Sequence, residues 1–405
     1  MRRVFLPLML TLPLGAAPND WNQWRGPNRD GIAAGFKAPS AWTPHSLTKV
    51  WTVTVGEGHS SPIVTGDRVF VFAREDGKEV MRCLALKDGA VVWQDAYEVP
   101  YSMNLAARGH GKGPKATPVA AGGSVYSLGI DGHVSAYDAE RGAVRWRTNF
   151  AADYKATSPS FGAAASPLVD GSNLIVPVGG KHGGGLVALD VVSGQVRWKW
   201  TGDGPAYASP VLATLGGVRQ IVTQMEKHCV AISPEDGREL WRLPFKTSFE
   251  QNSVTPVVAG EWVIFGGVSK PTFAVKVTAA GPEIVWENKV FAMYMSTPVL
   301  NGTTLYGMTT RQRGSLFALD VSTGQELWQG PGRVGENASL TDVGSALLVL
   351  NDAGELSVHE KQERGLKSVA SFKVAETPVW ASPAVAGSHL LVKDKTTLML
   401  YRVGD

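Results

Sequence analysis

The side chains of this sequence that could do chemistry are mostly basic and aromatic, and they recur at two places of a repeated pattern. One set stands just before a Ser-Pro or Thr-Pro pair, and the other follows the second apolar run after that pair. Clustered ammonium and guanidinium groups bind carboxylates, sulfates and phosphates. The pattern predicts a face that binds an anionic small ligand or a protein segment, formed by His59, Asn104, Arg108, His110, Lys112, Lys115, Lys181, Tyr207, Lys227, Asn252, Lys270, Tyr294, Arg311, Arg313, Trp380 and Lys393.

The argument for an anionic ligand rests on the local clustering of these residues. The formal net charge is only +3 over 405 residues, which is too small to indicate a nucleic-acid partner or a membrane surface. The longest loop of the expected face, residues 101–115, supplies several of the basic groups, and long loops in compact domains are often functional. The alternative, that these charges only solvate the loops, stays open.

No catalytic set can be assigned from the residues. A Ser-His-Asp mechanism of the hydrolase kind would need a strand-turn-helix nucleophile elbow, which the pattern does not contain. The glycine-rich run 179–185 has a lysine but lacks the Ser or Thr and the helix of a phosphate-binding loop, which favours a flexible loop. Glu226, Asp131 and His110 are the groups to consider for a polysaccharide lyase or hydrolase, although no close carboxylate pair is recognisable.

The chain has two cysteines, Cys83 and Cys229, each two residues before an alanine of the repeat. They occupy positions of small buried hydrophobic residues. A disulfide between them would join units that are not neighbours, which disulfide geometry disfavours. Zinc sites need Cys and His at short spacings that this sequence lacks. We therefore expect neither a disulfide nor a metal site.

These residues are carried by an internal repeat, Ala-x-Asp-x3-Gly-x3-Trp. Four copies with this spacing end at Trp146, Trp198, Trp241 and Trp328, and one of them has Ser233 in place of the aspartate. A copy from Ala85 to Trp93 is two residues shorter, and a copy from Ala274 to Trp286 is two residues longer. The aspartate can accept backbone N–H groups of the following turn, the glycine supplies a positive φ, and the tryptophan can wedge between units.

A Ser-Pro or Thr-Pro pair precedes each copy and counts the units. The pairs begin at Ser61, Thr117, Ser166, Ser209, Thr255, Thr297, the degenerate Ser339 and Ser382. Each pair opens a short apolar strand, a place where the missing N–H of proline does no damage, and three more short strands follow. Repeats of four strands predict an all-β, eight-bladed propeller with four-stranded antiparallel blades.

The two ends of the predicted ring have complementary defects. The eighth unit stops before any tryptophan strand, whereas residues 47–55, with Trp51, form such a strand before the first Ser-Pro pair. We expect this N-terminal strand to complete the last blade and to remove an exposed sheet edge. The seventh unit lacks both its proline and its tryptophan, and Phe372 is a candidate substitute for the latter.

The first residues predict export. Residues 1–17 contain two arginines, an apolar run and three small residues, the order of a secretory signal peptide. No cysteine follows the expected cleavage point, so we do not expect a lipoprotein. The predicted organisation is therefore a signal peptide (1–17), an N-terminal arm (18–46) whose Trp21 and Trp24 pack against the propeller, and the propeller itself (47–405), located in the periplasm or secreted.

The repeat resembles the tryptophan-docking repeat of the pyrroloquinoline quinone (PQQ) family, from about Leu47 to Arg402. That family contains quinoprotein alcohol dehydrogenases and BamB-type propellers that help to assemble outer-membrane proteins. For a dehydrogenase the resemblance implies PQQ, a calcium ion held by Glu, Asn and Asp, an adjacent pair of cysteines and a catalytic Asp. The adjacent cysteines and the Cys-x-x-Cys-His haem motif are absent, and no calcium ligand can be assigned.

Two functions remain after this comparison of motifs. The favoured one is a binding or scaffolding module of the cell envelope, without catalysis, whose partner is a small anionic ligand or an envelope protein. We expect no nucleic-acid partner, no membrane anchor and a monomeric protein. The alternative is a PQQ-dependent dehydrogenase of alcohols or sugars, with PQQ and calcium bound in an unusual way around Trp380 and Asn252.

Overall fold

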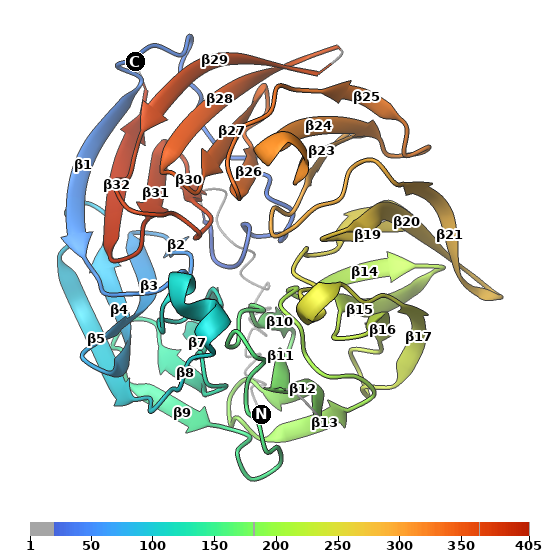
Figure 1. Ribbon diagram of the computed structural model, residues 1–405. Helices are drawn as coiled ribbons and strands as arrows, with labels where there is room; N and C mark the ends of the chain where they lie inside the picture. The colour runs from blue at the N-terminus through green and yellow to red at the C-terminus, as the bar shows by residue number, and fades with distance from the viewer. Residues whose placement is uncertain (1–19, 181–182, 364, 405) are drawn as a thin grey trace, which may run out of the picture.

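The computed structural model describes residues 20–180, 183–363 and 365–404. These residues form eight four-stranded antiparallel sheets arranged as blades around a common centre (Figure 1). The predicted eight-bladed propeller is confirmed. The expected signal peptide and Lys181 lie outside the described residues. No helix in the described part of the chain is long and apolar enough to cross a membrane.

Each blade is built from four consecutive strands, innermost first, apart from the last blade. The first four blades are β2 (Ile63–Thr65), β3 (Arg68–Glu75), β4 (Lys78–Ala85) and β5 (Val91–Glu98); β6 (Val119–Ala121), β7 (Ser124–Leu128), β8 (Val134–Asp138) and β9 (Val144–Thr148); β10 (Leu168–Asp170), β11 (Asn173–Gly180), β12 (Gly183–Asp190) and β13 (Val196–Trp200); and β14 (Val211–Leu215), β15 (Val218–Gln224), β16 (His228–Ile232) and β17 (Glu239–Pro244).

The remaining blades follow the same plan, and three short 3-10 helices lie in the loops. Blades 5 to 8 are β18 (Val257–Ala259), β19 (Trp262–Gly267), β20 (Lys270–Thr278) and β21 (Gly281–Asn288); β22 (Val299–Asn301), β23 (Thr304–Thr309), β24 (Ser315–Asp320) and β25 (Glu326–Gln329); β26 (Ala338–Asp342), β27 (Ala346–Asn351), β28 (Glu355–Gln362) and β29 (Gly365–Lys373); and β30 (Ala384–Ala386), β31 (His389–Lys393), β32 (Thr397–Val403) and β1 (Leu47–Thr54). The helices are η1 (Leu105–His110), η2 (Ser248–Glu250) and η3 (Arg311–Arg313).

The N-terminal strand closes the ring as the sequence predicts. Strand β1 pairs antiparallel with β32, and Trp51 lies opposite Leu400. The indole Nε1 of Trp51 donates to the carbonyl of Leu86 in the first blade, 2.8 Å away. The last blade therefore contains strands from both ends of the chain, and the pairing removes the free edge that an open sheet would expose.

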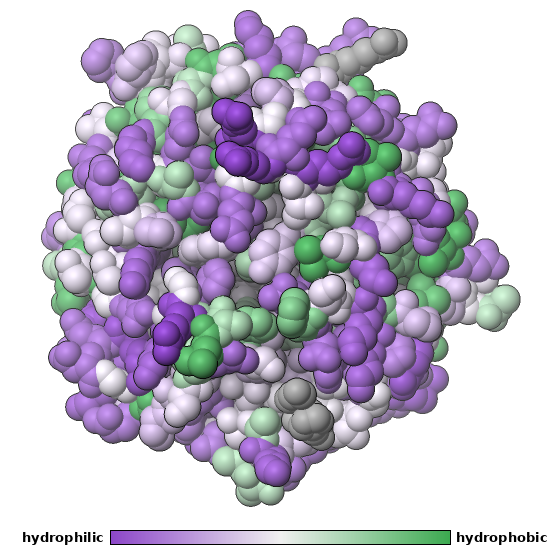
Figure 2. All heavy atoms as spheres, in the orientation of Figure 1, coloured by the Kyte–Doolittle hydropathy of each residue, from purple (hydrophilic) through white to green (hydrophobic). Residues whose placement is uncertain are grey.

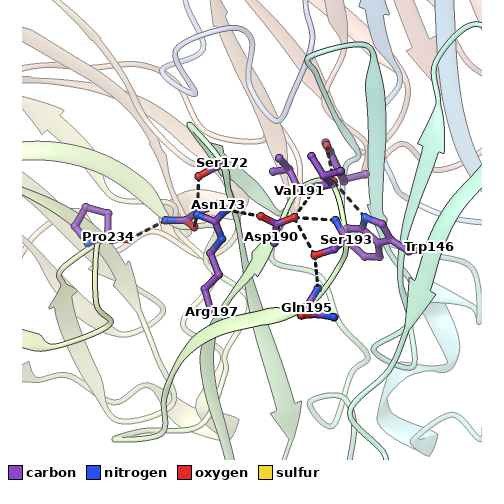
Figure 3. A network of polar contacts seen from close by, with 11 residues as sticks. Trp146, Ser172, Asn173, Asp190, Val191, Ser193, Gln195, Arg197 and Pro234 are labelled. Atoms are coloured by element: carbon purple, nitrogen blue, oxygen red, sulfur yellow. Dashed lines mark hydrogen bonds and ion pairs between the residues drawn. The ribbon is translucent and has the colours of Figure 1, made fainter.

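Tryptophan docking joins neighbouring blades, and Figure 3 shows one example between the second and third blades. The indole Nε1 of Trp146 donates to the carbonyl of Val191 at 3.2 Å. Asp190 holds the turn that carries this carbonyl, because its Oδ1 accepts from the N–H groups of Val192 and Ser193. Gly194 has φ +72°, and a Cβ there would lie 2.6 Å from the Trp146 ring. The repeat thus needs glycine both for its backbone conformation and for the close approach of the indole.

The same bond from an indole to a backbone carbonyl recurs around most of the ring. The acceptor is the residue that follows the aspartate position in the repeat of the next blade. The indoles of Trp93, Trp198 and Trp286 donate to the carbonyls of Ala139, Pro234 and Val321 in the next blade. Trp241 is different, because its Nε1 donates to the side chain of Gln220 in its own blade, at 2.6 Å.

The strand register corrects two alignments made from the sequence. Trp93 lies opposite Cys83, not Ala85, so the first copy has the ordinary spacing with cysteine in place of alanine. In the seventh blade the tryptophan position is Ala370, opposite Val358, and Phe372 lies opposite Leu356. Phe372 instead packs against Trp42 of the arm, with ring centroids 6.3 Å apart. Cys83 and Cys229 are both buried free thiols.

Five of the Ser/Thr-Pro pairs have a role for their Ser or Thr that the sequence did not suggest, since each donates its backbone N–H to the hydroxyl of the next pair. The backbone N–H of Thr117 donates to the hydroxyl of Ser166 in the next blade, 2.9 Å away, and Ser166 repeats this toward Ser209. At the seam the N–H of Ser382 donates to the hydroxyl of Ser61 at 2.8 Å. These buried bonds link the inner strands of successive blades and satisfy N–H groups that face no strand.

Candidate ligand-binding mouth

A cavity of about 220 Å³ lies where the inner strands begin. Figure 1 looks onto this face, which carries η1 and η2, and Figure 2 shows hydrophilic side chains over much of it. The loop before each inner strand contributes to the wall. Of the sequence-predicted residues, the cavity is lined by His59, His110, Lys115, Tyr207, Tyr294 and Trp380. We call this cavity and its lining residues the mouth.

Aromatic rings form much of the wall of the mouth. The rings of His110 and Trp380 meet edge to face with centroids 4.6 Å apart, and His59 lies 6.4 Å from Trp380. On another part of the wall Phe161 and Tyr207 are 5.9 Å apart in the same edge-to-face arrangement. Such contacts hold the rings in place and give the mouth an apolar, preorganised surface.

Lys115 places an ammonium group in this wall. Its Nζ donates to the backbone carbonyl of Phe161. Burial lowers the pKa of Lys115 to about 8, although the nearby Glu57 acts in the opposite direction. The side chain is therefore protonated at neutral pH, and it loses little further hydration when an anion binds.

His59 is an uncharged member of the wall. Burial, followed by the positive charges of Lys393 and Lys115, lowers its pKa to about 3. Its Nδ1 is buried and has no hydrogen-bond partner in the described part of the chain. A buried polar atom without a partner is costly, so the site favours a ligand that can satisfy it.

The floor of the mouth comes from the N-terminal arm. The arm enters along the far ends of the inner strands, where Trp21 forms a bridge with Val64 and the N–H of Ala33 donates to the carbonyl of Asp342. Figure 1 shows this blue segment crossing the centre of the ring. From there Trp24 and Arg25 reach the cavity and line it.

The arm is held by the same Ser/Thr-Pro pairs that join the blades. Trp24 Nε1 donates to the hydroxyl of Thr255 at 3.0 Å. The guanidinium of Arg25 donates to the carbonyls of Thr297 and Pro298, at 3.0 and 2.7 Å. Arg29 makes the corresponding bonds to the carbonyls of Ser166 and Pro167 in the third blade. The arm therefore bridges blades on different sides of the ring.

Charge in the mouth is one-sided. No aspartate or glutamate is among the described residues that line the mouth. Arg25 and Lys115 both line it. Burial lowers the pKa of Arg25 to about 10, which leaves it protonated at neutral pH. The mouth therefore combines two cations with aromatic walls and suits an anionic group that carries apolar surface.

The other sequence-predicted residues lie elsewhere. Asn252 is buried and structural, because its amide donates to the carbonyl of Met225 at 2.6 Å and its Oδ1 accepts from Thr247. Lys393 is buried behind the wall, where its Nζ donates to the carbonyl of Gly58 and burial lowers its pKa to about 7. Asn104 caps η1 by accepting from the N–H of Ala106.

The remaining basic residues do not line the mouth. Five are exposed: Arg108, Lys112, Lys227, Arg311 and Arg313. Lys270 is half-buried in β20, and Arg313 borders a separate pocket with Arg333 and Glu336. Of the three residues considered for a lyase or hydrolase, only His110 lines the mouth, so the described structure does not bring them together. Asp131 instead pairs with His133 at 2.8 Å.

The calcium ion of the quinoprotein dehydrogenases does not fit the mouth. Calcium takes about six to eight oxygen ligands, mostly from carboxylates and carbonyls. The described lining has no carboxylate, and the side-chain oxygen of Asn337 already accepts from the hydroxyl of Ser296 at 3.0 Å. In the described residues no group of three or more His, Cys, Asp or Glu side chains could hold a metal ion.

Sequence reasoning did not identify Trp24 and Arg25 as lining residues of the mouth. The only signal available was the composition of the arm, Trp-Asn-Gln-Trp-Arg-Gly-Pro-Asn-Arg-Asp-Gly, in which two arginines and two tryptophans are packed into a short non-repeated segment. Asn337 stands two residues before its repeat pair, as His59 and Trp380 do, whereas Phe161 stands five residues before Ser166.

Comparison with known proteins places the chain in a family. The family model described as outer membrane protein assembly factor BamB matches residues 77–330. Proteins of that name from Yersinia pestis and Burkholderia pseudomallei are 27% and 25% identical to the chain over 306 and 293 residues. These alignments cover 71% of this chain and 71% of the Yersinia protein, and 63% of this chain and 73% of the Burkholderia protein.

Solved structures share the fold. BamB from Moraxella catarrhalis has a TM-score of 0.63 at 18% identity, covering 88% of this chain and 97% of that one. A quinohemoprotein alcohol dehydrogenase from Comamonas testosteroni has a TM-score of 0.72 at 13% identity, covering 97% and 82%. Together with the matching family model, these results confirm the resemblance noted in the sequence: the chain belongs to the PQQ-like β-propeller family represented by the outer membrane protein assembly factor BamB.

Proposed function

We propose that this protein is a non-catalytic binding propeller of the bacterial envelope, which holds an anionic group of a partner protein in the mouth. The observation that carries the proposal is the lining of the mouth, where Arg25 and Lys115 stand among aromatic rings and no described lining residue is acidic. A protein partner is favoured over a free small molecule because the related proteins are named as assembly factors.

The cellular setting follows from the same reasoning. The pattern of residues 1–17 supports export, and the names of the relatives refer to the outer membrane. The partner is then another envelope protein, engaged in the assembly of outer-membrane proteins.

Oxidation by PQQ is not proposed. The described lining residues do not fit the calcium ion that accompanies the quinone, and Asn252, one of the residues considered for that role, is bonded into the protein interior. The likeness to a quinohemoprotein dehydrogenase, at 13% identity, concerns the fold.

Titration with two matched peptides tests the proposal. An acidic and a basic peptide with the same aromatic residues are added to the protein, and tryptophan fluorescence reports binding, since Trp24 and Trp380 line the mouth. The acidic peptide should bind, and Lys115→Met should weaken it by about tenfold. Arg108→Ala, at an exposed residue outside the mouth, is the control and should change nothing. Equal binding of both peptides would overturn the proposal.

A further inference from the structure

A second pocket, of about 470 Å³, opens beside the mouth. It is lined by loops of the sixth blade and by the loop that leads into the seventh. Tyr294 lines both cavities, so the two are neighbours. The helix η3, orange in Figure 1, lies at this place, and Figure 2 shows hydrophilic side chains gathered above it. We call this cavity the arginine pocket, after Arg313 and Arg333 in its lining.

The backbone brings the two arginines of this pocket together. The N–H of Arg333 donates to the carbonyl of Gln312 at 2.9 Å, and the N–H of Gly335 donates to the carbonyl of Arg313 at 3.3 Å. A Cβ at Gly314 would lie 2.3 Å from the carbonyl oxygen of Gly335, so glycine is needed for this close approach. Both arginine side chains therefore leave neighbouring points of the backbone and line one cavity.

Both arginines have a backbone conformation that their residue type disfavours. The φ angle is +62° at Arg313 and +70° at Arg333, in the left-handed region that glycine adopts easily. Glycine at these positions would relieve the strain, and both side chains are exposed, so neither is needed in the core. Strained residues that gather around a cavity point to a functional site.

The charges of the arginine pocket are not used within the protein. Neither the Arg313 nor the Arg333 guanidinium makes a hydrogen bond or an ion pair in the described part of the chain. Glu336 also lines the pocket, and no ion pair joins it to either arginine there. An exposed pair of one guanidinium and one carboxylate contributes little to stability. The lining keeps a net positive charge, since it has two arginines and one glutamate.

A phosphate group suits this pocket better than a carboxylate does. A phosphate ester carries a charge of about −1.5 to −2 at pH 7 and three strong acceptor oxygens. It can therefore accept hydrogen bonds from two guanidinium forks at once, whereas a carboxylate has two oxygens and is satisfied by one fork. The volume of about 470 Å³ falls within the range of about 300–1,000 Å³ that is usual for small-ligand sites.

We infer that the arginine pocket is a second anion site, separate from the mouth, which binds the phosphate group of a phosphate ester. Arg313 and Arg333 hold the phosphate oxygens, and Tyr294 stands between this site and the mouth. The phosphate can belong to a soluble ester or to a phospholipid headgroup. The inference goes beyond the proposed function and does not depend on the ligand of the mouth.

Two matched small anions test the chemistry of the site. Calorimetry at low ionic strength measures the affinity of the protein for glycerol 3-phosphate and for glycerate, which has a carboxylate in place of the phosphate. Glycerol 3-phosphate should bind at least tenfold more tightly. Equal affinity for the two anions, or no binding of the phosphate, would overturn the inference.

Variants at three arginines test the location of the site. The double variant Arg313→Gln, Arg333→Gln should weaken binding of glycerol 3-phosphate by at least tenfold. Arg311→Gln is the matched control, because Arg311 is an exposed arginine of the same helix that does not line the pocket; it should change the affinity by less than about twofold. An equal loss in Arg311→Gln would show that only the general charge of this face attracts the anion, and the inference would fail.

Arg313→Gly separates binding from folding. Glycine suits the positive φ of this position, so the variant should lose affinity for glycerol 3-phosphate without a lower melting temperature. A lower melting temperature together with lost binding would show that the arginine is structural, against the inference.

Vesicles identify the source of the phosphate. Cosedimentation compares phosphatidylcholine vesicles with and without phosphatidic acid, a phosphate monoester lipid. Sedimentation that requires phosphatidic acid and is lost in the double variant assigns a lipid headgroup, and binding of glycerol 3-phosphate alone assigns a soluble ester. Either result agrees with the inference. The acidic peptide should bind the mouth of the double variant unchanged, so a failure of the arginine pocket and a failure of the proposed function are distinguishable.

Discussion

The guanidinium Nη2 of Arg25 lies 2.7 Å from the backbone carbonyl oxygen of Pro298, which joins the N-terminal arm to the inner strand of the sixth blade. This bond connects residues 273 positions apart in the chain. It holds a charged side chain of the arm in the lining of the mouth. The arm therefore contributes to the binding chemistry as well as to the packing.

Replacing Gly194 by alanine should destabilise the protein through two effects. The residue has φ +72°, and the added Cβ would lie 2.6 Å from the Trp146 ring. We expect a loss of about 2–4 kcal/mol in the free energy of unfolding, measured with urea. Gly302→Ala separates the two effects, because Gly302 has φ +57° but open space around it; it should cost only about 1 kcal/mol. Equal losses would contradict the docking role of the glycine.

Ser61→Ala should open the seam between the first and last blades. Its hydroxyl accepts the buried N–H of Ser382, and without it that N–H has no acceptor. The expected loss is about 1–3 kcal/mol in the free energy of unfolding, measured by chemical denaturation. Ser345→Ala, at an exposed turn, should have no measurable effect. A neutral Ser61→Ala would show that the Ser61 hydroxyl contributes nothing to closure of the ring.

Affinity for the acidic peptide should fall as the pH rises through about 8. Only the protonated Lys115 attracts the carboxylate, and its pKa in the free protein is about 8, while the peptide carboxylate stays ionised throughout this range. Calorimetry from pH 6 to 10 measures the profile. His59 is already neutral there, since its pKa is about 3. Lys393 behind the wall also titrates, with a pKa of about 7, so two variants are compared to assign the effect to Lys115. The slope of affinity near pH 8 should disappear in Lys115→Met and persist in Arg108→Ala.

Glu79 should contribute a decrease in stability between about pH 4.5 and pH 7, against the opposite contribution of His59, whose pKa, lowered from 6.5 to about 3, makes stability rise with pH up to about pH 6.5. This carboxyl is fully buried between the first two blades, where it accepts from Tyr97 and from the N–H of Ile130. Burial raises its pKa from 4.5 to about 7, with Asp131 adding to the effect and Arg74 opposing it. In that window the unfolded chain has already lost the proton that the folded protein keeps, so raising the pH favours unfolding.

The size of this effect can be measured with one substitution. The shift corresponds to about 2–4 kcal/mol, so the stability of Glu79→Gln relative to the unaltered protein should rise by about this amount between pH 4.5 and pH 8. The neighbouring His133, whose pKa is raised by Asp131, contributes a remaining slope of the same sign. An unchanged pH profile in Glu79→Gln would show that this carboxyl titrates normally.

Calcium and PQQ should have no effect on thermal stability. A ligand that binds only the folded state raises the melting temperature, but the described lining residues provide no carboxylate for calcium. Scanning calorimetry with both compounds should show a shift of less than about 1 °C. A clear increase that required both compounds together would revive the dehydrogenase hypothesis.

The ring could be predicted because its information is local and repeated. Each Ser/Thr-Pro pair and each tryptophan carries the same backbone geometry, so counting them predicted eight blades and the pairing of Trp51 with the last blade. The errors arose where the repeat is degenerate. Cys83 takes the place of an alanine and Ala370 that of a tryptophan, because several residue types can occupy these buried positions.

The mouth was only partly predictable, for a different physical reason. Position before a repeat pair was enough to identify His59, Lys115 and Trp380 as lining residues. It could not show that Asn252 turns inward to bond with Met225, because loop direction depends on tertiary contacts. Nor could it place Arg25, since the arm has no period and its partners lie hundreds of residues away.

A crystal structure of the protein with the acidic peptide shows whether the mouth is the binding site. We expect electron density in the mouth for an acidic group of the peptide, with its carboxylate within hydrogen-bonding distance of Arg25 or Lys115 and an aromatic ring beside Trp380. A peptide bound along a blade edge or on the outer surface, with the mouth holding only water, would contradict the proposed function.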